Sequence, residues 1–163
     1  MTRALANRIM FILSLAGFCD SLYLTMAHAQ LVELKCGPSH GCEEVAHSAA
    51  AMGMGIPFLS NIPTAAFGIL MYLALAAGAF LRAATDNEVI HDRVSKFQWA
   101  ISLVSVLASG YLTYLEAYVI HAWCRYCVVS AIIILIHFIF ASIDRSMARK
   151  SNISASIVEG EIS

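Results

Sequence analysis

Charged residues are scarce in this chain, and their scarcity excludes an ordinary soluble protein. Only 13% of the 163 residues are charged, whereas soluble domains carry about 25%. The formal net charge is −1 and no basic run is interleaved with aromatic residues, so the sequence gives no indication of a nucleic-acid partner. With 60% hydrophobic residues and a mean hydropathy of +0.74, the composition is that of an integral membrane protein.

Four long apolar stretches predict an all-α membrane protein built as a four-helix bundle. They comprise residues 9–29, 62–81, 97–120 and 123–143. Each reaches or approaches the roughly 20 residues that a helix needs to cross a bilayer. We therefore expect one four-span domain over residues 1–143, with a loop at 30–61 between the first two spans and a short tail at 144–163.

Basic residues are distributed unevenly around these stretches. They precede the first, separate the second from the third and follow the fourth, whereas the loop at 30–61 contains a single one, Lys35. By the positive-inside rule, we expect both termini in the cytoplasm and the loop outside. A signal peptide ending near Ala27-His28-Ala29 is the alternative for the first stretch, but the apolar run is longer than the roughly 7 to 15 residues of a signal core.

The motif Cys124-Arg125-Tyr126-Cys127 stands at the start of the fourth stretch. Residues three apart share one face of a helix, about 5 to 6 Å apart at Cβ, so the two thiols can form a disulfide. A helix N-terminus and the neighbouring Arg125 favour the Cys124 thiolate. The motif is expected on the outer side, where disulfides persist. Taken alone, a CxxC is equally typical of two buried apolar cysteines or of half a zinc site.

A second cysteine pair, Cys36 and Cys42, lies in the outer loop. The glycines and proline between them predict a turn that lets the thiols approach. Residues 43–52 then predict a short helix on the membrane surface, covering the bundle. Two pairs on one side of the membrane indicate a relay, in which a soluble dithiol reduces the loop disulfide and a loop thiol attacks the CxxC disulfide. Because the CxxC stands at the lipid boundary, a quinone is the expected electron acceptor.

A few polar side chains and one further cysteine interrupt the apolar stretches. Asp20 is expected to face the bundle, either in a functional role or in a structural hydrogen bond. Glu116 is expected to be hydrated near the outer interface, and His137 to make a hydrogen bond inside the bundle. Cys19 is expected to be a buried, inert thiol. Three tyrosines near the outer end of the third stretch predict an interfacial belt or a pocket wall; they are Tyr111, Tyr114 and Tyr118.

The order of five motifs along the chain resembles the vitamin K epoxide reductase family, in particular its bacterial members. The motifs are Cys36 and Cys42 in the loop, Ser48 six residues after Cys42, Ile62-Pro63-Thr64-Ala65-Ala66-Phe67-Gly68, Tyr111-Leu112-Thr113-Tyr114 and the CxxC. The resemblance extends from the first stretch to Ile143. Many bacterial members carry a fused thioredoxin-like domain, and this chain is similar to those without it. The related DsbB proteins place their two cysteine pairs in a different order.

The resemblance implies a thiol:quinone oxidoreductase of the bacterial inner membrane, with its redox cysteines on the periplasmic side. It would reoxidise a soluble periplasmic DsbA-like protein, with ubiquinone or menaquinone as the acceptor, and so support disulfide bond formation. Cys36 would exchange with the partner, Cys42 would attack Cys124, and Cys127 would face the quinone. Thr64 stands where some relatives hold the quinone oxygen with an asparagine, and Ser48 would bind near the quinone or position the loop helix. The quinone-pocket residues expected on this basis are Ser48, Asn61, Thr64, Phe67, Tyr114 and Ala131.

Two other functions are compatible with paired cysteines. The first is a carrier of soft metal ions such as Hg²⁺, Cu⁺ or Zn²⁺, because thiolates are good ligands for soft metals. Transport needs polar ligands leading inward, and the fourth stretch has only His137 beyond Cys127. The second is a structural subunit whose disulfides join its loops. We predict no resident metal site.

Overall fold

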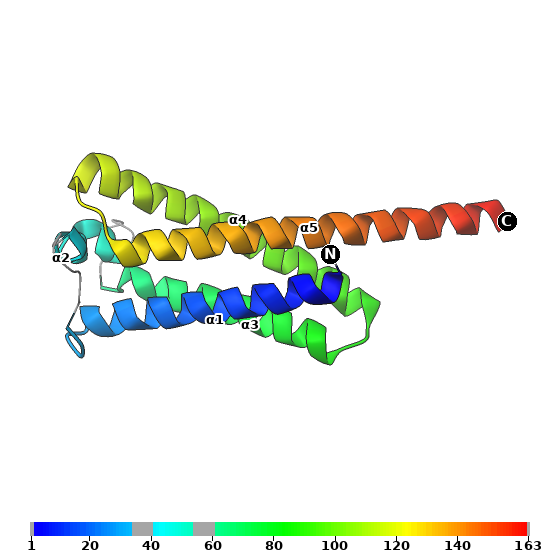
Figure 1. The fold of residues 1–163 in the computed structure, drawn as a ribbon, viewed down its shortest axis with the longest axis horizontal. Coiled ribbons are helices and arrows are strands. Elements are labelled where there is room, and N and C mark those ends of the chain that lie inside the picture. The colour runs from blue at the N-terminus through cyan, green and yellow to red at the C-terminus, as the bar shows by residue number, and fades with distance from the viewer. Residues whose placement is uncertain (1, 34–40, 54–60, 163) are drawn as a thin grey trace.

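The computed structural model describes residues 2–33, 41–53 and 61–162, with only the backbone described from residue 151 onward. Four long helices dominate this part of the chain (Figure 1). They are α1 (Arg3–His28), α3 (Thr64–Ala84), α4 (Glu88–Leu115) and α5 (Arg125–Ile162). All four are long and apolar enough to span a membrane. The prediction of an all-α, four-helix membrane protein is therefore confirmed.

The helices pack so that the cysteine motif and the segments around it lie at one end of the bundle. Helix α1 packs against α3 and α5, and α4 packs against α5. The short helix α2 (Gly41–Ala46), the end of α4 and the start of α5 meet at this end, which we call the α2 end (Figure 1). The N-terminus and the connection from α3 to α4 lie at the opposite end, beyond which α5 projects. The segment 144–162, expected as a tail, thus continues the last helix without a break.

Short polar residues determine where two of the helices begin. The Thr2 hydroxyl accepts a hydrogen bond from Leu5 N at 3.4 Å and caps α1. Asn87 caps α4 by accepting from Val89 N at 2.9 Å. Such caps satisfy backbone N–H groups that have no partner inside the helix. Because of the Asn87 cap, α4 begins well before the apolar stretch at residue 97, and the helix there extends beyond the predicted span.

The bundle has an apolar surface, as expected of helices solvated by lipid, and its interior contains polar as well as apolar side chains. Many large aliphatic side chains are exposed, while Gln98, Ser102, His137 and Asp144 are fully buried. The hydrogen bond predicted for His137 is confirmed, since its Nδ1 lies 2.9 Å from the Ser102 hydroxyl. Cys19 is exposed on α1, so the prediction that it is buried was wrong. Its neighbours in sequence do not reveal which way the helix is rotated.

A buried ionic cluster joins all four long helices at the end opposite α2. Asp144 of α5 pairs with Arg82 of α3 at 2.8 Å and with Arg3 of α1 at 3.4 Å. Ser95 of α4 donates to the same carboxylate at 2.9 Å. Arg82 also donates to Gln98 Oε1 at 3.1 Å. Arg82 is one of the basic residues between the second and third apolar stretches, yet only 5% of it is exposed.

The predicted surface helix over residues 43–52 is only partly correct. Helix α2 covers Gly41–Ala46, and a separate 3₁₀ turn covers Ala49–Ala51. The break follows from Ser48, whose hydroxyl donates to Val45 O at 2.6 Å while its N–H bonds to the same carbonyl at 3.1 Å. A serine that bonds its own backbone in this way competes with continuation of the helix.

The segment after the 3₁₀ turn is fastened to the start of α3. Gly53 N donates to Ile62 O at 2.8 Å, and Met52 forms an antiparallel bridge with Pro63. Gly53 has φ of 58°, a backbone conformation that glycine adopts without the steric penalty of a side chain. Helix α3 begins at Thr64 rather than at 62, immediately after Pro63. These contacts hold residues 41–53 over the α2 end of the bundle.

Candidate functional site

The CxxC motif is presented at the α2 end by the short connection from α4 to α5. Helix α4 ends in a π-helical turn, η5 (Glu116–Ile120), and His121 then reverses the chain with φ of 57°. Cys124 precedes α5 and is buried, and its carbonyl accepts from Val128 N at 3.0 Å. Cys127 lies in the first turn of α5. The motif thus stands at the helix N-terminus, as its position in the sequence predicts.

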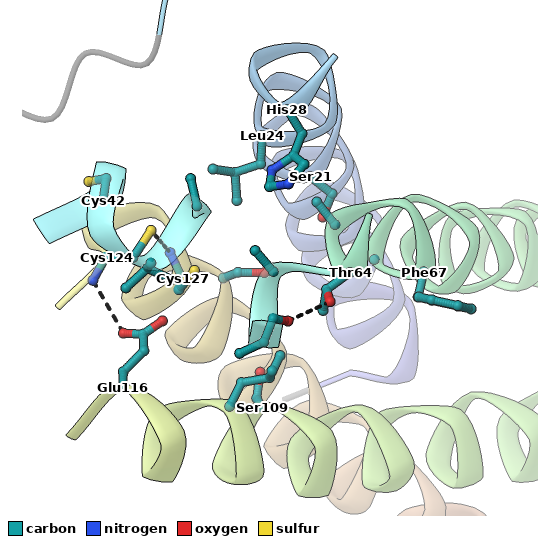
Figure 2. A pocket seen from close by; sticks show the side chains of 18 of the residues that line it. Ser21, Leu24, His28, Cys42, Thr64, Phe67, Ser109, Glu116, Cys124 and Cys127 are labelled. Atoms are coloured by element: carbon teal, nitrogen blue, oxygen red, sulfur yellow. Dashed lines mark hydrogen bonds between the residues drawn. The ribbon is translucent and has the colours of Figure 1, made fainter. Parts of the chain in front are cut away.

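Cys124 and Cys127 are reduced thiols that interact with each other. The Cys127 N–H donates to Cys124 Sγ at 3.4 Å (Figure 2). Cys124 lies in the connection between the third and fourth candidate spans. The hydrogen bond with the Cys127 thiol lowers the pKa of Cys124 to about 7, although burial acts in the opposite direction. Cys124 therefore has substantial thiolate character near neutral pH, which favours thiol exchange.

A buried carboxylate lies against this dithiol. Glu116, at the start of η5, is only 3% exposed, and its Oε2 accepts a hydrogen bond from Cys124 N at 3.2 Å (Figure 2). The Cys127 thiol is its second partner. The expectation that Glu116 is hydrated was therefore wrong, because the π-helical turn, closed by Ala122 N donating to Glu116 O at 3.2 Å, directs the side chain inward. The available signal was a lone acid, eight residues before the CxxC, in an otherwise uncharged stretch.

The loop cysteine Cys42 packs against the CxxC. Cys42 and Val45 of α2 form a buried cluster with Ala122 and Cys124, and Cys127 packs against it. The approach depends on Gly41, where a Cβ would lie 2.6 Å from the Trp123 carbonyl oxygen. Cys36, the other member of the predicted loop pair, lies outside the described residues. The structure thus brings three of the four predicted redox cysteines together.

A cavity of about 490 Å³ opens beside the thiols, between α2 and the four long helices. Its wall is mainly apolar and includes Cys42, Cys124, Cys127 and Glu116 (Figure 2). The Ser105 hydroxyl, also in this wall, is buried and has no hydrogen-bond partner among the described residues. An apolar cavity with a few placed donors is typical of small-molecule sites. A quinone fits these features, because its ring is apolar and its carbonyl oxygens accept hydrogen bonds.

Two of the six predicted pocket residues line this cavity. They are Thr64, whose hydroxyl donates to Ala50 O at 2.7 Å, and Phe67. Ser48 is not in the described wall, and its hydroxyl donates to Val45 O at 2.6 Å just after α2. Tyr114 is 55% exposed and packs against Tyr118, with the two ring centroids 5.1 Å apart.

The remaining two predicted pocket residues also lie elsewhere. Asn61 is exposed, and Ala131 is half-buried on α5 without reaching the described wall. Several polar wall residues that the sequence did not single out are small and resemble packing positions; they are Ser21, Ser105, Ser109 and Ser130. A serine in an apolar helix reads equally well as a packing residue or a hydrogen-bond donor, so only its position in the fold distinguishes the two.

The described residues contain no group of three or more histidine, cysteine or acidic side chains placed to hold a metal ion. His47, which directly follows α2, is exposed. No feature of the described part of the chain supports a soft-metal carrier better than an oxidoreductase.

Comparison with known proteins agrees with this geometry. The family described as "Vitamin K epoxide reductase family" matches residues 8–142, which include the described cysteines, Glu116 and most of the four helices. No curated protein matches the chain. Because the family match covers well over half of the sequence and coincides with a dithiol beside an apolar cavity, the chain belongs to the vitamin K epoxide reductase family of membrane thiol–disulfide oxidoreductases.

Proposed function

We propose that this protein passes electrons from a soluble periplasmic thioredoxin-like protein to a membrane quinone, and thereby supports disulfide bond formation. The observation that carries the proposal is the position of the CxxC between two partners. On one side Cys124 shares a buried cluster with Cys42 of the loop. On the other side both Cys124 and Cys127 form part of the cavity wall. A dithiol in this position can exchange with a loop thiol and also reach a molecule dissolved in the bilayer.

The thiol steps follow from this arrangement. The reduced partner attacks a Cys36–Cys42 disulfide at Cys36, becomes oxidised and leaves both loop thiols reduced. The Cys42 thiolate then attacks Cys124 in the oxidised CxxC, and Cys127 leaves as a thiolate. Cys36 resolves the Cys42–Cys124 bond, so the loop disulfide forms again and the CxxC is a dithiol. Each cycle therefore moves one electron pair and two protons to the CxxC.

The quinone, when bound, supplies an acceptor for two electrons and two protons, so that two thiols become one disulfide. This chain's own residues bind and orient it. The buried Ser105 hydroxyl, which has no partner among the described residues, would donate a hydrogen bond to a carbonyl oxygen, and Phe67 would provide apolar contact in the same wall. Thr64 is part of the same wall, where its hydroxyl donates to Ala50 O at 2.7 Å.

The arrangement of the termini supports the proposed orientation. The N-terminus and the projecting end of α5 lie at the end opposite α2 (Figure 1). Basic residues also gather there, among them Arg3 and Arg145, whereas the described part of the α2 end is nearly without them. The positive-inside rule then places both termini in the cytoplasm and the cysteines in the periplasm of a bacterial inner membrane.

The test is quinone reduction by the purified protein in micelles, supplied with a reduced DsbA-like protein and either ubiquinone or menaquinone. We expect quinone-dependent oxidation of the partner. The Cys127→Ala variant should abolish turnover and accumulate a mixed disulfide at Cys124, whereas Cys19→Ala, which removes an exposed thiol on α1, should keep full activity. Undiminished quinone reduction in Cys127→Ala would contradict the proposal.

A second variant tests the cavity as the quinone site. Ser105→Ala removes the unpartnered hydroxyl, and a lost hydrogen bond of about 0.5 to 1.5 kcal/mol corresponds to a roughly 2- to 10-fold rise in the KM for quinone. Oxidation of the reduced partner by the loop cysteines should be unaffected in a single turnover. An unchanged KM would show that the quinone binds elsewhere.

A further inference from the structure

Glu116 is a buried acid whose two partners both belong to the redox motif. Its Oε2 accepts from Cys124 N at 3.2 Å, and the Cys127 thiol is its other hydrogen-bond partner. No basic side chain pairs with it among the described residues. An acid in a membrane helix is costly to bury and usually faces the bundle interior for a functional reason. A backbone N–H and a thiol are modest compensation for that cost.

The local fold places this carboxylate in an unusual way. Glu116 begins the π-helical turn η5, and π-helical turns within α-helices occur frequently at functional sites. The turn is followed by His121 in the left-handed region, and together they return the chain so that Cys124 N points at Glu116. Figure 2 shows Glu116 directed at the motif from the end of α4.

We propose that Glu116 is the catalytic proton acceptor for Cys127 during oxidation of the CxxC. This inference rests on the proposed function and specifies how its thiol protons leave. Formation of the disulfide removes two electrons and two protons from the Cys124–Cys127 dithiol. Cys124 reacts as its thiolate, the proton of which has gone to solvent. Cys127 gives its proton to the Glu116 carboxylate as the sulfur–sulfur bond forms, and the electron pair passes to the quinone.

The proton balance closes without a further group. The protonated Glu116 gives its proton to the reduced acceptor in the same cavity, and the second proton comes from solvent, which restores the carboxylate. The overall change is two thiols and one quinone to one disulfide and one hydroquinone. In the reverse direction of the same step, a protonated Glu116 returns the proton to Cys127 as it leaves.

Other titratable groups face the same region and are candidates for the same role. Helix α2, which packs against η5, contributes Cys42 and Glu43 to the cavity wall. His47, which follows α2, and His28 of α1 also line it. Glu43 and His47 are exposed, in contrast to the buried Glu116. Glu116 is hydrogen-bonded to the reacting thiol, as a general base must be, and it is also buried.

The experiment compares Glu116→Gln with Glu116→Asp and with Glu44→Gln, which removes an exposed acid on α2 at the same end of the molecule. The glutamine keeps an oxygen to accept the Cys124 N–H but does not take up a proton. The reduced, purified proteins are oxidised with diamide, a soluble thiol oxidant, between pH 6 and 9. The CxxC disulfide is quantified by mass spectrometry, so no quinone is needed for this readout.

We expect Glu116→Gln to slow CxxC oxidation at pH 7 by about 10²-fold, the lower end of general-base effects. Its rate should recover as the pH rises, because hydroxide then replaces the carboxylate, while Glu116→Asp regains part of the rate at pH 7. Glu44→Gln should match the unaltered protein. A Glu116→Gln variant with the normal rate and pH profile overturns the inference, as does a slow rate at every pH, which indicates damage to the structure.

The same proteins separate this inference from the proposed function. If the unaltered protein fails to reduce quinone while Glu116→Gln shows the altered diamide profile, the proton role stands and the quinone function fails. If quinone turnover is normal in both the unaltered protein and Glu116→Gln, the function stands and the proton role fails.

Discussion

Replacing Gly41 with alanine should separate the loop cysteine from the CxxC. A Cβ on residue 41 would lie 2.6 Å from the Trp123 oxygen and 3.2 Å from Trp123 N. Real Cβ contacts are essentially never below 3.0 Å, so α2 or the connection before Cys124 must move by at least several tenths of an ångström. Both contacts are to backbone, which cannot rotate away as a side chain tip can. The distance between Cys42 and Cys124 must therefore change.

The expected consequence is mainly kinetic. Overpacking of this kind costs about 1 to 3 kcal/mol. Thiol exchange requires the attacking sulfur to approach along the disulfide axis, and a misplacement of about 1 Å can cost about 10²-fold in rate. We expect Gly41→Ala to lower transfer from Cys42 to Cys124 by about 10- to 100-fold, with smaller changes in the reaction of the CxxC itself with an added oxidant.

The assay is rapid quenching with acid and alkylation of the thiols after mixing oxidised protein with a reduced partner. Peptides are then analysed for the Cys42–Cys124 disulfide. Gly110→Ala is the matched control, because a Cβ on residue 110 of α4 would meet nothing within 4 Å. If Gly41→Ala and Gly110→Ala both form the Cys42–Cys124 disulfide at the unaltered rate, the close approach of α2 to the CxxC does not govern transfer, and the reasoning is refuted.

Two further predictions concern stability and pH. Asp144→Asn removes one member of a buried ion pair and leaves Arg82 charged in the bundle, so it should lower the free energy of unfolding by about 3 to 5 kcal/mol. The control is Asp92→Asn at an exposed ion pair, which should lower the free energy of unfolding by at most about 1 kcal/mol in the same micelle unfolding assay. Equal losses in the two variants would contradict this prediction. Because the Cys127 thiol lowers the pKa of Cys124 to about 7, alkylation of Cys124 should rise with pH to a midpoint near 7, and Cys127→Ala should move that midpoint to higher pH. An unmoved midpoint, measured by mass spectrometry of iodoacetamide-treated protein, would exclude Cys127 as the cause.

The sequence predicted those properties that depend on short windows of residues. Whether a stretch of about 20 residues can cross a bilayer depends on its own hydrophobicity, so the four spans were recognisable although their ends were not. The placement of the CxxC at a helix N-terminus followed from the apolar run after Cys127. The limits of α2 were missed because one hydrogen bond, from the Ser48 hydroxyl to Val45 O, outweighs the apolar spacing of residues 43–52.

The interior of the site needed long-range contacts that no local pattern contains. The position of Glu116 near the outer end of the third apolar stretch suggests that its carboxylate is hydrated, but a π-helical turn directs the carboxylate at Cys124. Tyr114 shares its stretch with Ser105, yet the rotation of α4 exposes Tyr114 and places Ser105 in the cavity wall. Hydrophobicity and residue spacing thus suffice to identify a membrane dithiol protein. Which polar groups surround the dithiol depends on helix rotation and on backbone contacts between distant segments, and these exist only once the bundle has formed.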